Sequence, residues 1–403
     1  MGGVCLGMSW TTTSLVTARQ RFVLAALRGR EPFAELCRRF GIARSCGYKW
    51  LRRYQHGGRP GLADRSRRPR GSPRRLAPRW QRAVRRLRRG QPTWGPRKLR
   101  TRLRAEQPRA RLPSARTLGR WLRRWGLTRR PRRRPRRGPP QARLRRLVPQ
   151  APNEVWTVDF KGWFRTGDGT RVEPLTVRDL FSRYLLAFRL LPSQADTPVR
   201  RVFRRVFRRH GLPRAIRCDN GAPFGGSGPR GLSRLSVWWR RLGLRVEFGR
   251  PAHPEDNAGH EQMHGVYQRE VADQPAWTPA DHQRRTDRWV RRFNRQRPHE
   301  ALGRRVPAQI HRPARHRWPP RLPAWRYPRG WPRVTVNPRG YVRWRRRSRF
   351  IGRAFAGERL GLAPLPHGGR AVHLGDDLLG HLHEGDPHES LRPVQLTRPP
   401  AAP

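Results

Sequence analysis

Residues 154–164 read EVWTVDFKGWF, and this run of β-branched and aromatic residues predicts a strand that carries one acid, Asp159. Two further strands are predicted over 172–178 and 184–191, with Gly167-Asp168-Gly169 as a turn. Downstream, the hydrophobic pattern predicts helices over 198–210, 234–242, 257–272 and 281–294, alternating with strands over 215–219 and 245–248. This β-β-β-α-β-α-β-α order predicts a mixed sheet covered by helices, in a domain over residues 151–311.

A first helical unit is predicted over residues 18–58. Apolar stripes there indicate three short helices, and the piece from 32 to 54 has the proportions of a helix-turn-helix. The side facing a DNA groove would carry Arg44, Ser45, Lys49, Arg52 and Arg53. The alternative is a plain three-helix bundle whose basic face is only solvated.

A second helical unit is predicted over residues 80–127. Ser114 is a good N-cap for a helix that Gly126 ends, and Arg116, Arg120 and Arg123 would be exposed on it. Two such units joined by an Arg/Pro-rich linker, 59–79, predict DNA recognition in two parts. A second basic linker, 128–150, is expected to be disordered alone and to follow phosphates when DNA is bound.

The C-terminal part is predicted to be a small β domain over 333–385, after a Pro-, Arg- and Trp-rich linker, 312–333. One hairpin is expected from 334–336 to 341–344 and another from 371–374 to 378–383. The predicted fold class is therefore multidomain: helix-turn-helix units, an α/β core with a mixed sheet, and a small β domain.

Charge points to a polyanionic partner. The 403 residues contain 92 Lys+Arg and 26 Asp+Glu, a net charge of +66. Such a charge disfavours a metabolic enzyme of small anions and favours nucleic acid. The abundance of arginine can also reflect a GC-rich genome, so its distribution says more. Sixteen of the 26 acids lie between positions 151 and 300, where two basic arms flank them.

Cysteines and apolar runs exclude other classes. Cys5, Cys37, Cys46 and Cys218 form no CxxC pair and no zinc spacing, which is typical of a reducing compartment. No apolar run is long enough to span a membrane, so we expect a cytoplasmic protein without a membrane partner.

Three acids stand where an α/β sheet places active groups. Asp159 lies within the first strand, Asp219 ends the strand before Asn220-Gly221, and Glu261 lies early in the helix over 257–272. Three converging carboxylates would bind two Mg²⁺ ions, with Mn²⁺ as a substitute, and two metals support phosphoryl transfer without a covalent nucleophile. The alternative is three solvated or salt-bridged acids in an arginine-rich domain.

Four motifs resemble the integrase-type catalytic core of bacterial insertion-sequence transposases. They are residues 156–160 (WTVDF), 218–224 (CDNGAPF), 253–261 (HPEDNAGHE) and 293–302 (FNRQRPHEAL). The resemblance covers roughly residues 18–360 and implies a ribonuclease H-like fold. It also implies a D,D,E triad of Asp159, Asp219 and Glu261 that acts catalytically and holds the metal. Ala258 and Gln262 depart from the family's usual Gly and Arg.

Two alternatives concern the third acid. Glu255 has 35 residues between it and Asp219, a spacing often quoted for the superfamily, but it sits in a Pro-bounded loop, so Glu261 is favoured. His260-Glu261-Gln262-Met263-His264 also matches the H-E-x-x-H zinc-protease helix. No third ligand follows convincingly, and a chain of charge +66 makes an odd peptidase.

The predicted function is that of a DNA transposase. The N-terminal units would bind terminal inverted repeats, and the core would cut a strand and join its 3′-OH to target DNA. Lys161 and Arg217 are expected to steady the scissile strand. Synapsis of two ends implies a homo-oligomer on DNA. The alternative is a domesticated DNA-binding protein or transcriptional regulator with an inactive core.

Overall fold

The structure is a computed structural model and describes residues 14–65, 78–128, 147–249, 258–366, 368–383 and 391–393. By its internal contacts the chain divides into two compact units, Met1–Arg75 and Leu76–Pro403. Glu255, with most of the two basic linkers predicted over 59–79 and 128–150, lies outside the described residues.

Three helices build the first unit: α1 (Leu15–Arg28), α2 (Phe33–Arg39) and α3 (Arg44–Gly57), followed by the 3-10 turn η1 (Arg59–Leu62). The hydroxyl of Ser14 caps α1 by accepting from the N–H of Thr17 at 3.2 Å. Buried Phe22, Leu36 and Trp50 join the helices in one core. The α2–α3 turn begins at Gly41, whose φ of 63° suits glycine. The predicted helix-turn-helix piece is thus confirmed as a pair of packed helices.

The second helical unit contains α4 (Pro78–Gly90), α5 (Pro96–Glu106) and α6 (Ala115–Arg124). Ser114 caps α6 as the sequence predicts, because its hydroxyl accepts from the N–H of Thr117 at 3.1 Å. The apolar faces of the three helices meet in a core that includes Trp80, Leu99 and Leu118. Burial of these faces against one another is what holds such short helices in place.

A mixed sheet forms the centre of the second unit. Its strands are β1 (Val155–Phe160), β2 (Phe164–Arg165), β3 (Arg171–Asp179), β4 (Leu185–Leu191), β5 (Ala215–Cys218) and β6 (Arg245–Phe248). The order is β2-β3-β1-β5-β6, and β4 also pairs with β3. β1 runs antiparallel to β3 and parallel to β5, and β5 runs parallel to β6. The predicted mixed sheet is confirmed.

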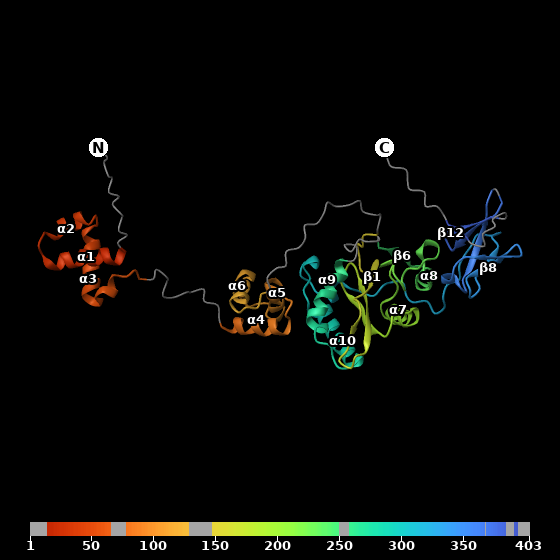
Figure 1. The fold of residues 1–403 in the computed structure, drawn as a ribbon, viewed down its shortest axis with the longest axis horizontal. Helices are drawn as coiled ribbons and strands as arrows, with labels where there is room; N and C mark the ends of the chain where they lie inside the picture. The colour runs from red at the N-terminus through yellow and green to blue at the C-terminus, as the bar shows by residue number, and fades with distance from the viewer. Residues whose placement is uncertain are drawn as a thin grey trace, which may run out of the picture. The chain divides into compact units, whose positions relative to one another are not determined.

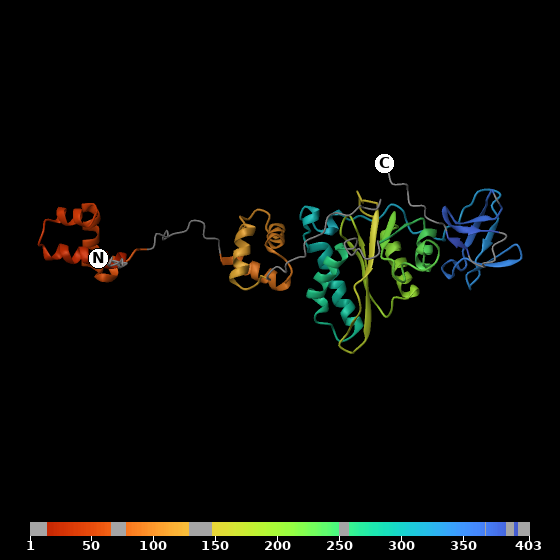
Figure 2. The same cartoon turned by 45° about the horizontal axis from the view of Figure 1, so that its top comes forward.

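Helices cover both faces of this sheet (Figures 1 and 2). On one face lie α7 (Asp196–His210) and α8 (Arg234–Arg241), where Phe203, Phe207 and Trp239 pack on Trp156 and Val158. On the other lie α9 (Ala258–Tyr267), the π-helical turn η4 (Gln268–Ala272) and α10 (Pro279–Gln296). Met263, Tyr267 and Trp289 of that layer pack on Leu185 and Phe188 of β4.

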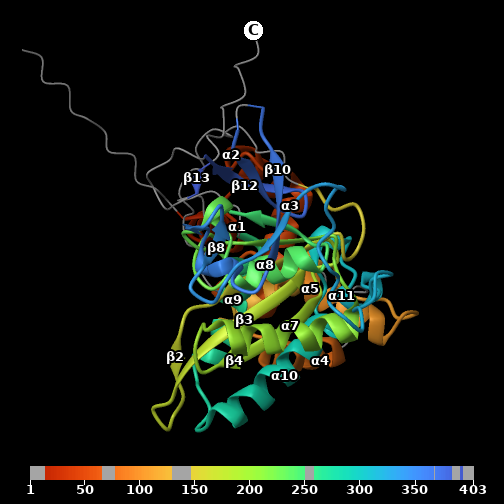
Figure 3. The same ribbon diagram turned by 90° about the vertical axis from the view of Figure 1, so that its right-hand side faces the viewer.

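The β2–β3 hairpin projects from the sheet beside the start of α10 (Figure 3). Its turn is fixed by two backbone hydrogen bonds of 2.9 Å, from Gly167 N to Ala276 O and from Asp168 N to Trp277 O. A Cβ at Gly167 would lie 2.8 Å from the Trp277 ring, so this close approach requires glycine.

The C-terminal β domain packs on the core. It consists of β7 (Arg333–Thr335), β8 (Tyr341–Trp344), β9 (Arg347–Phe350), η6 (Arg353–Phe355), β10 (Arg359–Pro364), β11 (Arg370–Leu374), β12 (Asp377–Leu382) and β13 (Arg392–Pro393). Five of these strands form an antiparallel sheet in the order β13-β12-β11-β10-β7. Leu232 and Val237 of the core share a hydrophobic cluster with this domain, and Arg240 forms an ion pair with Asp377. Short elements before it are η2 (Pro229–Gly231), η5 (Glu300–Leu302) and α11 (Pro307–Ile310).

The structure corrects three sequence predictions. The strand expected over 154–164 breaks after Phe160, because residues 161–163 leave the ladder before β2 begins. The hairpin expected between 334–336 and 341–344 is wrong, since β7 pairs with β10 and β8 pairs with β9. The stretch predicted as a linker, 312–333, packs on the protein: Trp318 contacts the central core and Trp325 the C-terminal one.

The predicted fold class is otherwise confirmed, and so is the hairpin of β11 and β12. Cys37, Cys46 and Cys218 are free thiols, and Cys5 lies outside the described residues. Across the described ranges, no helix is both long and apolar enough to cross a membrane.

Candidate active site

A polar patch lies on the face of the sheet that α9 covers. Along β1, Trp156 and Val158 point into the core under α7, so the intervening Thr157 and Asp159 point to the opposite face. Along β3, the same alternation places Thr176 and Arg178 on the α9 side. The β1–β3 register sets Asp159 opposite Thr176 and Thr157 opposite Arg178. Four polar side chains of adjacent strands therefore share one surface.

Asp219 follows the strand next to β1. The parallel register pairs Val155 with Ala215 and Thr157 with Arg217, and β5 ends one residue before Asp219. Asp159 near the end of β1 and Asp219 just after β5 therefore both lie toward the carboxyl ends of adjacent parallel strands. Asn220 fixes the turn that follows, because its amide donates to Gly249 O at 2.8 Å.

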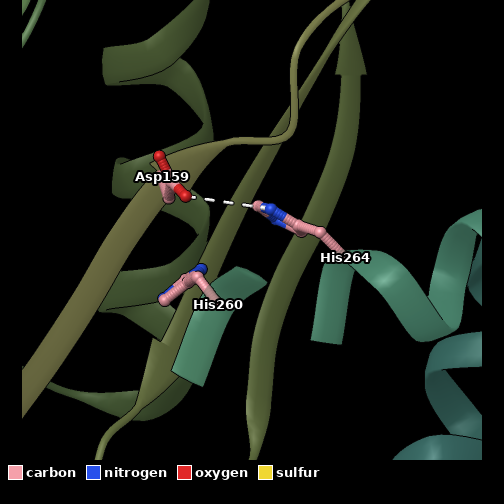
Figure 4. A group of neighbouring side chains, drawn as sticks. All are labelled: Asp159, His260 and His264. Atoms are coloured by element: carbon pink, nitrogen blue, oxygen red, sulfur yellow. Dashed lines mark ion pairs between the residues drawn. The ribbon is translucent and has the colours of Figure 1, made fainter. Parts of the chain in front are cut away.

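Two histidines on α9 contact this patch. His260 Nε2 lies 2.6 Å from the hydroxyl of Thr157, and His260 Nδ1 lies 3.1 Å from the hydroxyl of Thr176. His264 Nε2 lies 3.0 Å from the same Thr176 hydroxyl. His264 Nδ1 lies 3.8 Å from Asp159 Oδ2, the pair joined by the dashed line in Figure 4.

One set of tautomers satisfies the contacts of Thr176. The hydroxyl of Thr176 donates its single hydrogen to the backbone carbonyl of Asp159 at 2.9 Å. Its oxygen then accepts from both imidazoles when His264 carries its proton on Nε2 and His260 carries one on Nδ1. The remaining nitrogen of His260 lies 2.6 Å from the hydroxyl of Thr157, which also lies 3.4 Å from the carbonyl of Arg178. In this tautomer, His264 Nδ1 presents a lone pair to Asp159.

Burial and nearby cations keep both rings neutral. Burial, together with the charges of Lys161 and Arg178, lowers the pKa of His264 to about 3. Burial also lowers the pKa of His260 well below its usual value. At neutral pH the contact between His264 and Asp159 is therefore a neutral ring beside a carboxyl group rather than an ion pair.

Arg178 anchors the first turn of α9. It is 4 % exposed, and its guanidinium donates to the backbone carbonyl of Gly259. A Cβ at Gly259 would lie 2.9 Å from the guanidinium, so glycine is what lets α9 sit so close to the sheet. Burial lowers the pKa of Arg178 to about 9.

Asp219 and Glu261 are both accessible. Asp219 is exposed directly after β5. Partial removal of water from its carboxyl group nevertheless raises its pKa, because this effect outweighs a hydrogen bond from the backbone N–H of Gly221 that lowers it. Glu261 is exposed on α9, one turn before His264. Glu261 and His264 are three residues apart and therefore neighbours on the helix, with His264 buried against the sheet and Glu261 exposed.

Among the described residues, the metal-ligating side chains whose atoms gather within 4.8 Å are Asp159, His260 and His264, with Asp219 and Glu261 outside this group. The donor chemistry of Asp159, Asp219 and Glu261 nevertheless fits Mg²⁺, which takes carboxylate oxygens and keeps several waters. Asp159 lies near the end of β1 and Asp219 directly after β5, its parallel neighbour.

The geometry does not fit a zinc protease. An H-E-x-x-H site needs a lone pair from each imidazole aimed at one point. Here the two nitrogens that converge, His260 Nδ1 and His264 Nε2, both lie within hydrogen-bond distance of the Thr176 hydroxyl, which occupies the point between them.

The predicted DNA contacts lie on the surface, with one exception. Arg44, Lys49 and Arg52 are exposed on α3, and Arg116, Arg120 and Arg123 are exposed on α6. Lys161 is half-buried directly after β1, and burial lowers its pKa. Arg217 is instead engaged inside the protein, because its guanidinium donates to Glu247 at 2.8 Å and to Leu147 O at 2.9 Å.

Thr157, Thr176 and Arg178 are site residues that the sequence reading missed. The signal was present, because WTVD on β1 and LTVR on β3 alternate apolar and polar residues. These polar residues form a patch only because β1 and β3 pair in a register that sets them opposite one another, and the sequence does not show that register.

Family models match the two parts of this arrangement. Residues 149–254 and 242–307 match models that are both described as the integrase core domain. Residues 18–70 match a helix-turn-helix domain and residues 46–122 a homeodomain-like domain. The chain thus contains an integrase core domain preceded by helix-turn-helix domains, and the resemblance drawn from its motifs is confirmed.

Its relatives are insertion-element proteins. The 31.7 kDa protein of insertion element IS407 from Burkholderia multivorans is 31 % identical over 172 residues, which cover 42 % of this chain and 58 % of the relative. The 39.2 kDa protein of insertion element IS476 from Xanthomonas euvesicatoria is 29 % identical over 170 residues, which cover 42 % and 47 %. The chain spans about half the length of these curated relatives.

Solved structures are similar at low scores. The catalytic core domain of HTLV-2 integrase in complex with magnesium matches 40 % of this chain and 99 % of its own, at 14 % identity and a TM-score of 0.32. The Mos1 strand transfer complex matches 70 % and 91 %, at 12 % identity and a TM-score of 0.30. Scores this low carry no argument about function.

Proposed function

We propose that the protein is a DNA transposase of the insertion-sequence type. Its core would cut a DNA strand to free a 3′-OH and then join that 3′-OH to a phosphodiester of target DNA. Asp159, Asp219 and Glu261 are the proposed catalytic and metal-holding residues, with Mg²⁺ or Mn²⁺ as the ions.

The observation that carries the proposal is the position of Asp159 near the end of β1 and of Asp219 directly after β5. These strands are parallel neighbours, and α/β sheets bind their ligands at the carboxyl ends of such strands. Glu261 lies on α9, the helix that His260 and His264 join to the β1–β3 face of the sheet. We therefore propose that the three acids act at this edge of the sheet.

The chemistry follows from this donor set. Divalent ions held by the carboxylates supply activation of the attacking oxygen and stabilisation of the leaving one. The protein's own part is to orient the carboxylates, and the threonine–histidine network does so by fixing the main chain at Asp159. Lys161, two residues after Asp159, is placed to neutralise a phosphate of the bound strand. No covalent nucleophile is needed.

DNA recognition is assigned to the two helical units. Arg44, Lys49 and Arg52 on α3, with Arg116, Arg120 and Arg123 on α6, present exposed donors for phosphates and base edges. We propose that they bind the terminal inverted repeats, and that pairing of two ends requires at least a dimer on DNA.

Strand transfer tests this function. Labelled duplexes that carry the DNA flanking the coding region are incubated with the full-length chain and Mg²⁺ or Mn²⁺. Cleavage and joining to a target plasmid are expected. Binding without cleavage under either metal would support the alternative, a regulator with an inactive core.

A further inference from the structure

His264 Nδ1 distinguishes this site from one built of carboxylates alone. In the tautomer whose Nε2 donates to Thr176 at 3.0 Å, Nδ1 is an acceptor. It faces Asp159 Oδ2 across 3.8 Å. Among the described residues, Asp159 and His264 belong with His260 to a group whose ligand atoms lie within 4.8 Å of one another, so a metal ion can take both atoms as ligands.

The separation of the two atoms suits one metal ion. Bonds from a divalent metal to an imidazole nitrogen or a carboxylate oxygen measure about 2.0–2.2 Å each, so their sum exceeds 3.8 Å. Adjacent ligands in an octahedral shell lie about 3 Å apart, so the two side chains have to approach each other by less than about 1 Å to hold one ion. Figure 4 shows the ring and the carboxyl group directed toward each other, from α9 and β1.

His260 does not have this capacity. Its Nδ1 lies 3.1 Å from the hydroxyl of Thr176, its Nε2 lies 2.6 Å from the hydroxyl of Thr157, and the residue is 1 % exposed. Both nitrogens are in use, so the ring is a support for the metal ligand rather than a ligand. Such outer partners fix the orientation of the groups that bind the metal.

We propose that His264 Nδ1 is a metal ligand beside Asp159, so that this centre prefers a transition-metal ion such as Mn²⁺ or Co²⁺ to Mg²⁺. Mg²⁺ takes oxygen ligands and retains its waters, whereas first-row transition metals accept imidazole with affinity rising from Mn²⁺ to Co²⁺. The positive charges of Lys161 and Arg178 also act on the His264 ring and oppose the binding of a cation there. The negative charge of Asp159 is therefore required as well to hold the ion. The inference rests on the proposed function and names the ion that the same site selects.

The test uses Mn²⁺ and the full-length chain. Pulsed electron paramagnetic resonance detects the ¹⁴N coupling of an imidazole bound directly to Mn²⁺. The wild type is expected to show this coupling. His264→Gln keeps an N–H donor for Thr176 and removes the nitrogen that faces Asp159. This variant should lose the coupling. Its affinity for Mn²⁺ should fall by at least about tenfold, because removing even a residue that only supports a metal ligand lowers metal affinity by about 10–100-fold.

The matched control is His282→Asn. His282 is buried on α10, bonded to Tyr267 and to the N–H of Ala276, and Asn keeps the acceptor for that N–H. Coupling and affinity should match the wild type. Should His264→Gln not fold, Asp159→Asn gives a second route, because loss of the shared carboxylate should also remove the coupling.

An oxygen-only shell around Mn²⁺ in the wild type, an unchanged coupling in His264→Gln, or no Mn²⁺ binding overturns the inference. The proposed function fails separately, if the wild type binds the DNA but carries out no strand transfer with either Mg²⁺ or Mn²⁺.

Discussion

The hydroxyl of Thr176 donates a hydrogen bond to the backbone carbonyl of Asp159 at 2.9 Å, directly across the β1–β3 ladder. The same oxygen lies 3.1 Å from His260 Nδ1 and 3.0 Å from His264 Nε2, so one side chain links two strands to α9. Thr176 is fully buried, and this link therefore has no water to replace it.

Replacement of Thr176 should weaken the core. Thr176→Val keeps the shape but removes the hydroxyl that His260 and His264 share, and a buried unsatisfied polar group costs about 1–3 kcal/mol. Urea unfolding followed by tryptophan fluorescence measures the loss. Thr176→Ser retains the hydroxyl and should stay close to the wild type. Equal stability of the Val and Ser variants would contradict the network.

A buried ion pair joins Glu270 and Arg297. Both side chains are 7 % exposed, and Glu270 also accepts from Trp289 at 2.7 Å and from Thr93 of the second helical unit. Glu270→Gln leaves the arginine charge buried and should cost about 3–5 kcal/mol, measured as a fall in unfolding free energy.

The control for this pair is Asp281→Asn, which breaks the exposed ion pair with Arg284. A loss of only about 0–1 kcal/mol is expected there. If both variants lost the same amount, burial would not be what makes the Glu270–Arg297 pair matter.

Stability should fall in mild acid. Burial lowers the pKa of His210, His282 and His311 to about 4. The unfolded chain takes up protons on these rings near pH 6.5, while the folded chain does so only near pH 4. The free energy of unfolding therefore decreases as the pH falls through this window, by about 1.4 kcal/mol per pH unit for each ring. Above this window the three rings do not change it.

Chemical unfolding at a series of pH values measures this slope. His282→Asn removes one titrating ring and should flatten the slope by about a third of the contribution of the three residues. A stability that stays level or rises between pH 6.5 and pH 4 would contradict the burial of these rings.

The order of elements could be predicted from the sequence, because the hydrophobic residues of this core recur with the spacing of strands or of helices. Trp156, Val158 and the apolar face of 198–210 were recognisable as core, and both pack in it. The register between strands could not be predicted, because it depends on pairing between segments that are distant in the sequence. The hairpin of 334–336 with 341–344 failed for this reason, as β7 pairs with β10.

The acids of the site were found from their motifs, and their polar support was not. Thr157, Thr176 and Arg178 carry no signal in isolation, because a threonine or arginine inside a strand is ordinary. His260 and His264 were noticed as a zinc-protease spacing, but the sequence could not show that a hydroxyl sits between them.

The third acid is tested by a pair of substitutions. Glu261 lies on α9 near His264, whereas Glu255 precedes the helix and lies outside the described residues. Glu261→Gln should abolish strand transfer and leave DNA binding intact, while Glu255→Gln should retain most of the activity. Gel shift and strand-transfer assays on the same preparations separate the two effects, and the reverse result would assign the role to Glu255.

The most direct measurement of the central claim is the Mg²⁺-dependent release and joining of a labelled terminal strand by the wild type, Asp159→Asn and Asp219→Asn. The account predicts activity in the wild type, none in either variant, and equal binding of the DNA by all three. Strand transfer that persists in Asp159→Asn or in Asp219→Asn would contradict it.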